Sequence, residues 1–231
     1  MKKKLLFSFL LLIALVIVVG CNKKEEEKEK SLLGGWELLL TDKQVAIPEE
    51  VTKVFDEATK EYVGMDFEPV ALLGTQIVAG TNYMFLCKGK PVVPNPETSY
   101  KIVVVYENLE GKASIIHAND FDFVKYVNKN SINKYEDLSG GWAVSMPEQG
   151  VKLDDKVQTA FDNASKKIQD AKYLPIGVLG KQLVSGTNYA LLAYGSINNV
   201  NGIYLLTLYE DLNGTQEIVA SSYVDLAEYN K

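Results

Sequence analysis

The sequence predicts an α+β protein made of two equal repeats, each with one helix packed on an antiparallel sheet of about five strands. The segment Gln76–Tyr83 recurs as Gln182–Tyr189, 106 residues later. Gly34-Gly35-Trp36 recurs as Gly140-Gly141-Trp142 at the same offset, and a helical stripe of apolar residues between these motifs recurs as well. A constant period of self-similarity indicates one structural unit that is present twice.

The repeats divide the chain of 231 residues into five segments. We expect a signal peptide at 1–20, a lipidated cysteine with a charged spacer at 21–33, a first domain at 34–128, a linker at 129–137 and a second domain at 138–231. Each repeat has the usual size of a domain and is long enough to bury a hydrophobic core of its own.

The N-terminus predicts export. Lys2–Lys4 precede an apolar run of 16 residues, Leu5–Gly20, which is shorter than the ~20 residues that a membrane-spanning helix needs. Val18-Val19-Gly20-Cys21 resembles a bacterial lipobox, in which Cys21 becomes the lipidated N-terminus. A simple N-terminal membrane anchor is the alternative. Both predict a chain exported and tethered at the outer face of a bacterial membrane, with the eight charges of Lys23–Lys30 as a solvated spacer.

Composition argues against several classes of partner and chemistry. The net charge is −6, which becomes −9 when the three lysines of the signal peptide are removed, and arginine is absent. Such a surface has no basic footprint for nucleic acid. Cys21 and Cys87 are the two cysteines, so we expect no disulfide framework and a buried Cys87.

Catalysis is not expected. His117 is the single histidine, and alanine occupies its position in the second repeat. Neither a nucleophile motif, nor a cluster of metal ligands, nor a glycine-rich phosphate loop is present. The sequence therefore predicts a protein that is not an enzyme and that needs neither cofactor nor metal.

One helix per repeat is the clearest element. In the first repeat, Pro48-Glu49-Glu50 places proline and acidic residues at the start of a helix, and Gly64 is expected to end it. The expected buried stripe is Val51, Val54, Phe55, Ala58 and Tyr62, with Val157, Ala160, Phe161, Ala164 and Ile168 in the second repeat.

Strands are expected before and after each helix. Residues 34–40 predict a short strand, and residues 69–77 and 83–88 predict a hairpin that turns at Val78–Gly80. A second hairpin is expected at 100–106 and 114–118, with counterparts at 203–209 and 216–220, where the offset falls to 103. The lost residues lie in a loop that we expect at 89–99.

In these features the sequence resembles the cystatin family. Gln-x-Val-x-Gly is the signature of the first hairpin loop of cystatins, and Thr-Asn-Tyr follows the glycine in stefins. Leu33-Gly34-Gly35-Trp36 is similar to the N-terminal glycine region of plant cystatins, and the order of one strand, one helix and four strands is also the cystatin order. The resemblance implies tandem cystatin-like domains and inhibition of papain-like cysteine proteases, whose active-site cleft cystatins block without covalent chemistry.

The resemblance implies three contact segments in each repeat. The contact residues are Gly34, Gly35, Gly140 and Gly141 in the trunk, Gln76, Ile77, Val78, Ala79, Gly80, Gln182, Leu183, Val184, Ser185 and Gly186 in the first hairpin loop, and Leu109 and Leu212 in the second. Trunk glycines let the backbone approach a cleft closely because they have no Cβ. The second hairpin departs from the family, since it has leucine where many cystatins carry Pro-Trp.

Two functions remain open at this stage. The first is a membrane-tethered inhibitor of papain-like proteases. The alternative is a surface module for adhesion, envelope assembly or ligand binding, which keeps the hairpin motif for its turn geometry alone. Trp36 and Trp142 likewise have two interpretations, as lids on the core or as contact residues beside the trunk.

Overall fold

The computed structural model describes residues 36, 38, 47–129, 141–146, 153–198 and 200–231. In this part the chain is mostly antiparallel sheet with few helices, which agrees with an α+β fold. The first repeat contains α2 (Glu49–Thr59), β1 (Met65–Val78), β2 (Gly80–Pro91), β3 (Ser99–Glu107), β4 (Ala113–Asp120) and α3 (Val124–Lys129). The second contains β5 (Ala143–Val144), α4 (Asp155–Ser165), β6 (Ala171–Val184), β7 (Gly186–Ile197), β8 (Val200–Glu210), β9 (Gln216–Val224) and the 3₁₀ helix η1 (Leu226–Tyr229).

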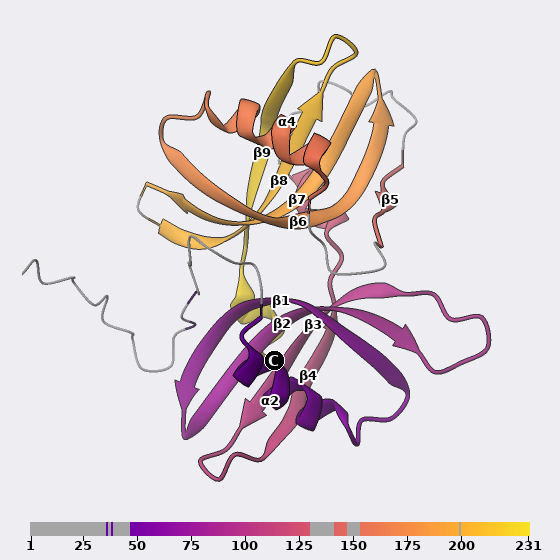
Figure 1. Cartoon of the computed structure of the whole chain (residues 1–231), viewed down its shortest axis with the longest axis vertical. Coiled ribbons are helices and arrows are strands. Elements are labelled where there is room, and N and C mark those ends of the chain that lie inside the picture. Colours follow the sequence, from indigo (N-terminus) through magenta and orange to yellow (C-terminus); the bar gives the residue numbers. More distant parts are fainter. Residues whose placement is uncertain (1–35, 37, 39–46, 130–140, 147–152, 199) are drawn as a thin grey trace, which may run out of the picture. The chain divides into compact units, whose positions relative to one another are not determined.

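The described strands form one sheet in each repeat. Their orders are β1-β2-β3-β4 and β5-β6-β7-β8-β9, and every neighbouring pair is antiparallel. Figure 1 shows α2 lying across one face of the first sheet and α4 lying across one face of the second. Irregularities fall at equivalent places, between Val104 and Val105 in β3 and between Thr207 and Leu208 in β8. The two sheets therefore repeat one topology in detail.

The helix of the first repeat starts where the sequence predicts, and both helices end before the last residue of the predicted stripe. Glu49 opens α2 directly after Pro48, and the Asp154 carboxylate caps α4 by accepting from the Val157 amide at 2.8 Å. The first three turns of the apolar stripe face the sheet as expected. Tyr62 and Ile168, however, lie beyond the last residues of α2 and α4, so both assignments to the helical stripe are wrong. Tyr62 instead packs on the Phe67 ring at 5.2 Å, as the chain turns into β1.

The strands are longer than predicted, and the loops are shorter. The β2 strand continues through Pro91, so the loop expected at 89–99 shrinks to 92–98. In the second repeat β7 ends at Ile197 and β8 begins at Val200, which accounts for the residues lost there. The strand expected at 34–40 lies mostly outside the described residues, and Trp36 and Leu38 are not part of a strand. Its counterpart is β5, which pairs with β6.

Both faces of each sheet are buried. Along β2, Phe85 and Cys87 point toward α2, whereas Met84 and Leu86 point to the opposite face, and all four are completely buried. Strands buried on both faces are continuously apolar rather than alternating. Burial raises the pKa of the Cys87 thiol, and its complete burial confirms the expected core role.

The sheet faces opposite α2 and α4 share one hydrophobic cluster, called here the shared core, to which α3 and η1 also contribute. Met84, Leu86 and Ile102 contribute to it from the first sheet, and Leu192 and Leu205 from the second. A second cluster lies under α4 and a third under α2. Each repeat thus has a core of its own under its helix, as the sequence predicts. The core that the two repeats share was not predicted from the sequence.

Several expectations fall outside the described residues. These are the signal peptide, Cys21, the charged spacer, Gly34, Gly35, Gly140 and the linker from residue 130 onward. Among the helices that the structure describes, none is long and apolar enough to cross a membrane.

Candidate functional site

The turn between β1 and β2 is built around Gly80. Val78 pairs with Gly80, which leaves Ala79 alone at the tip. Gly80 has φ +131°, a backbone conformation that residues with a side chain rarely adopt. A Cβ at this position would lie 2.2 Å from the Glu107 carbonyl oxygen. The glycine therefore permits both the turn and its close approach to the end of β3.

The second repeat reproduces this geometry. Gly186 has φ +126°, and a Cβ there would lie 2.3 Å from the Glu210 carbonyl oxygen. The Tyr209 hydroxyl donates to the Ser185 carbonyl at 2.5 Å. In the first repeat, the Tyr106 hydroxyl donates to the Ala79 carbonyl, also at 2.5 Å. These tyrosines fasten the tip of each first hairpin to the strand that leads into the second.

The first and second hairpin loops consequently lie side by side at one end of each sheet. We call residues 76–80 with 107–112 the first hairpin edge, and residues 182–186 with 210–215 the second hairpin edge. The four loops are far apart in sequence, and the glycine contacts and tyrosine bonds bring them together in pairs.

Gln76 and Gln182 support the turn from within. The Gln76 side chain is buried, and its Oε1 accepts from Asn82 Nδ2 at 2.7 Å. Gln182 is half-buried and accepts from Asn188 at 2.8 Å. The outward contact role implied for these glutamines by the resemblance therefore does not match their placement. Their amides close the base of the hairpin across the strand pair.

The side chains that do face outward are apolar. Ile77 is 54% exposed and Leu183 is 76% exposed, and they occupy the same position in the two repeats. Val78, Ala79 and Ser185 are also exposed, while Val184 is half-buried. Exposed apolar side chains grouped at one edge are typical of an interaction surface.

The second hairpin loops present one leucine each. The Asn108 side chain accepts from the amides of Glu110 and Lys112, both at 2.9 Å, and Asp211 accepts from those of Asn213 and Thr215 at 2.8 and 2.7 Å. The bonds from Thr215 and Asn213 lower the pKa of the Asp211 carboxyl. These five-residue loops are therefore held by bonds to their own first side chain, and they leave Leu109 85% exposed and Leu212 82% exposed.

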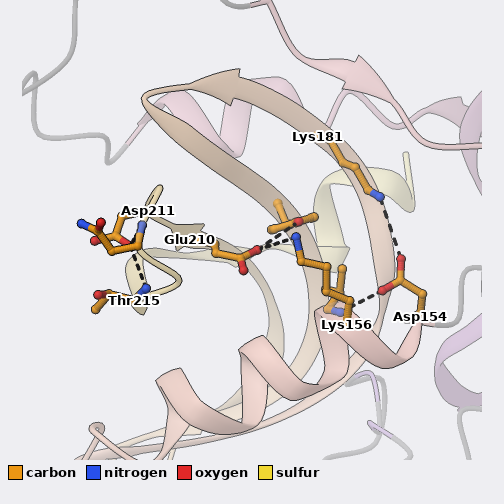
Figure 2. Close-up of polar contacts among 9 residues, drawn as sticks. Asp154, Lys156, Lys181, Glu210, Asp211 and Thr215 are labelled. Carbon is orange, nitrogen blue, oxygen red and sulfur yellow. Dashed lines mark hydrogen bonds and ion pairs between the residues drawn. The ribbon is translucent and has the colours of Figure 1, made fainter.

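The charged residues behind the two edges differ. Figure 2 shows Lys156 reaching from α4 to Glu210, with a 3.1 Å ion pair, and Lys181 approaching Asp154 at 3.9 Å. Glu210 also accepts from the Tyr189 hydroxyl. In the first repeat Glu107 likewise accepts from the Tyr83 hydroxyl at 3.0 Å, but Glu50 stands where the second repeat has Lys156. The helix residue behind the first edge is thus acidic, whereas the one behind the second edge is basic.

The trunk is described only at its end in the second repeat. Gly141 is exposed and lies two residues before Ala143, which pairs with Lys181 of β6. Because this pairing is antiparallel, the chain on the N-terminal side of Ala143 runs toward the hairpin turn at Gly186. Trp36 and Trp142 are half-buried against the shared core, which favours their interpretation as lids.

The sequence showed the side chains that support the hairpin turns only as repeated positions without an assigned role. Asn82 and Asn188 belong to the repeated segment, and Tyr106 and Tyr209 recur at the offset of 103 residues. Their roles depend on which strands are neighbours, so only the fold identifies them. Across the described residues, no group of three acidic, histidine or cysteine side chains could hold a metal ion.

Neither a model of a known protein family nor a curated protein matches the chain. A functional assignment therefore depends on the geometry of the two hairpin edges together with the resemblance of their motifs.

Proposed function

We propose that the chain is a membrane-tethered, cystatin-like inhibitor of papain-like cysteine proteases, with tandem cystatin-like domains. Each hairpin edge fills the active-site cleft of the protease without covalent chemistry. A lipid on Cys21 tethers the protein at the outer face of a bacterial membrane. The observation that carries the proposal is the pairing of the two hairpin loops at one end of each sheet, with apolar tips exposed.

The geometry suits insertion into a narrow cleft. The first hairpin tip consists of one small residue, Ala79 or Ser185, next to a glycine. A tyrosine hydroxyl holds the backbone carbonyl at this tip, and an Asn or Asp side chain holds the second hairpin loop. Little conformational entropy therefore remains to be lost on binding. Burial of the exposed leucines and Ile77 would supply the hydrophobic part of the affinity.

The first experiment is titration of papain and a cathepsin with the soluble chain from Asn22 to Lys231. We expect inhibition that is lost by about 30-fold to 1,000-fold in the combined variant Ile77→Asp and Leu183→Asp, because each aspartate would be buried without a partner. Each single variant reports on one edge. These positions are preferable to the turn glycines, where any side chain would disturb the fold itself.

The matched control carries Val63→Asp and Val200→Asp. Both valines are as exposed as the tested residues and lie outside the hairpin edges, so this variant should inhibit like the wild type. If the intact, folded chain fails to inhibit at micromolar concentration, the inhibitor proposal is wrong for these proteases. The non-inhibitory surface module would then be the better interpretation.

Whole cells extend the same titration to the tether. With the full chain, protease inhibition should sediment with the cells. In Cys21→Ser the inhibition should move to the supernatant, since the acceptor of the lipid is missing. Any inhibition that still sediments with the cells should come from chains that retain the signal peptide. Equal release of the wild type and Cys21→Ser into the supernatant would contradict the tether.

A further inference from the structure

Each repeat ends in a similar segment, called here the closing segment. Phe121–Tyr126 follows β4, and Val224–Tyr229 occupies the same place at the end of β9, 103 residues later. Both turn in the same way, because the Asp122 carboxylate accepts from the Val124 amide and the Asp225 carboxylate accepts from the Ala227 amide, each at 3.0 Å. The two segments are therefore equivalent in sequence and in local structure.

Equivalent residues of these segments contact each other. The Tyr126 and Tyr229 hydroxyls form a buried hydrogen bond of 3.0 Å. Lys125 Nζ lies 3.8 Å from Glu228 Oε2, and these two residues also correspond at the offset of 103. A residue meets its own counterpart at a two-fold axis, where both partners use the same surface.

Away from that point the contacts are exchanged reciprocally. Asn119 Nδ2 donates to the Tyr229 carbonyl at 3.2 Å. Ser222, the counterpart of Asn119, donates to the Tyr126 carbonyl at 2.8 Å. Each repeat thus gives the other the hydrogen bond that it receives, as the subunits of a two-fold dimer do.

Apolar side chains follow the same exchange. The Phe123 ring packs on Trp142 of the other repeat at 6.1 Å, edge to face. Leu226, the counterpart of Phe123, lines a cavity together with Trp36, the counterpart of Trp142. Both closing segments border the shared core that the two sheets form.

We infer that the sheet face opposite α2 or α4 and the closing segment of each repeat form an association surface, whose partner is the equivalent surface of the other repeat. The repeats hold each other as the subunits of a two-fold dimer do, so the connection through 130–140 is not needed to keep them together. This inference is independent of protease inhibition.

The chemistry favours pairing of the two unlike repeats. Two copies of the first repeat would place Lys125 against Lys125, and two copies of the second would place Glu228 against Glu228. The Tyr194 hydroxyl donates to the Leu72 carbonyl of the first repeat, whereas Lys88, its counterpart, is paired with Glu68. Charge repulsion disfavours both like pairs, and loss of the Tyr194 bond further disfavours a pair of first repeats.

The test cuts the connection in the assembled protein. A specific protease site is inserted between residues 133 and 134 of the chain that starts at Asn22, and the folded protein is cleaved completely. We expect both fragments to elute together at the volume of the uncut protein and to separate only in denaturant. Separation of the fragments in native buffer at micromolar concentration would overturn the inference.

A charge exchange tests the reciprocal contact itself. In the cut protein, Lys125→Glu should weaken association by about 3-fold to 10-fold, as expected for an exposed pair, and adding Glu228→Lys should restore it. Lys112→Glu disturbs the comparable pair with Glu110 inside the first repeat and should leave association unchanged. An exchange variant no better than Lys125→Glu alone would contradict the proposed axis.

Discussion

At the residue scale, Gly80 has a structural role that its position in a hairpin motif does not reveal. Its φ of +131° disfavours residues with a side chain, and the atom that a Cβ would meet first belongs to the second hairpin. The same holds for Gly186. The glycine is thus the residue that lets the two loops of one edge touch, and its substitution acts on the fold before it acts on any partner.

We expect Gly80→Ala to lower the free energy of unfolding by about 1–3 kcal/mol, because a Cβ there would lie 2.2 Å from the Glu107 carbonyl oxygen, in addition to the strain of a positive φ. Gly111→Ala is the control, since Gly111 also has positive φ, +78°, but nothing lies within 4 Å of its Cβ position. Urea denaturation of both variants measures the difference. A Gly80→Ala protein as stable as Gly111→Ala would show that the contact with Glu107 is not required.

At the element scale, the two closing segments differ in how well they fill space. Phe123 lies directly over Gly180, where its ring occupies the place of a Cβ. On the other side the smaller Leu226 borders a pocket of about 470 Å³ that is partly open to solvent, together with Trp36 and Leu38. The counterpart of Gly180 is Gly74, which likewise has no Cβ.

We therefore expect Leu226→Phe to raise the free energy of unfolding by about 0.5–2 kcal/mol, the range usual for filling a cavity. Thermal unfolding followed by circular dichroism measures it. The reverse change, Phe123→Leu, should destabilise the protein because it opens a matching cavity beside Trp142. A Leu226→Phe variant with a lowered melting temperature would mean that the cavity walls cannot accept the ring.

At the scale of the whole molecule, buried tyrosines join the repeats. The Tyr100 hydroxyl donates to the Ser145 carbonyl at 2.5 Å, and Tyr194 and Tyr229 make the contacts described above. Burial raises the pKa of Tyr194 to about 12 and raises those of Tyr100 and Tyr229 further; the bond with Tyr126 adds to the rise at Tyr229. Each must stay protonated in the folded state.

Stability should consequently fall at alkaline pH. The unfolded tyrosines ionise near pH 10, so the stabilisation is complete below pH 10 and declines as the pH rises toward the folded pKa, which for Tyr194 is about 12. The slope is about 1.4 kcal/mol per pH unit for each such tyrosine. Urea unfolding between pH 8 and pH 11 measures it. Tyr194→Phe should reduce the slope, and a flat profile would contradict the buried pairing.

Much of the fold could be predicted because the same pattern occurs twice in the sequence, so each repeat supports the interpretation of the other. Val51, Phe55 and Ala58 recur with their helical spacing, and the hairpin turn at Gly80 recurs with its glycine. The ends of the elements were less predictable, since Tyr62 keeps the helical spacing but packs on Phe67 after the helix has ended. Spacing indicates which residues share a face of a helix, but it does not show where the helix ends.

The candidate site was predictable in its loops and less so in its roles. Ile77 and Leu109 are exposed as a contact surface requires, whereas Gln76 turns inward to Asn82, a distinction that depends on cross-strand pairing. The continuously apolar strands, such as Tyr83–Cys87, carried a signal for burial on both faces. That signal did not show that the other repeat covers the second face of each sheet.

By itself, the sequence determined the duplication, the order of helix and strands, and the glycine turns, because these follow from local spacing and backbone conformation. Only the tertiary structure decided that each pair of hairpin loops meets at one edge and that the sheet faces opposite α2 and α4 share a core. Contacts such as Tyr126 with Tyr229 join residues more than a hundred positions apart. Such contacts form only when whole elements pack, and no local pattern in the chain encodes them.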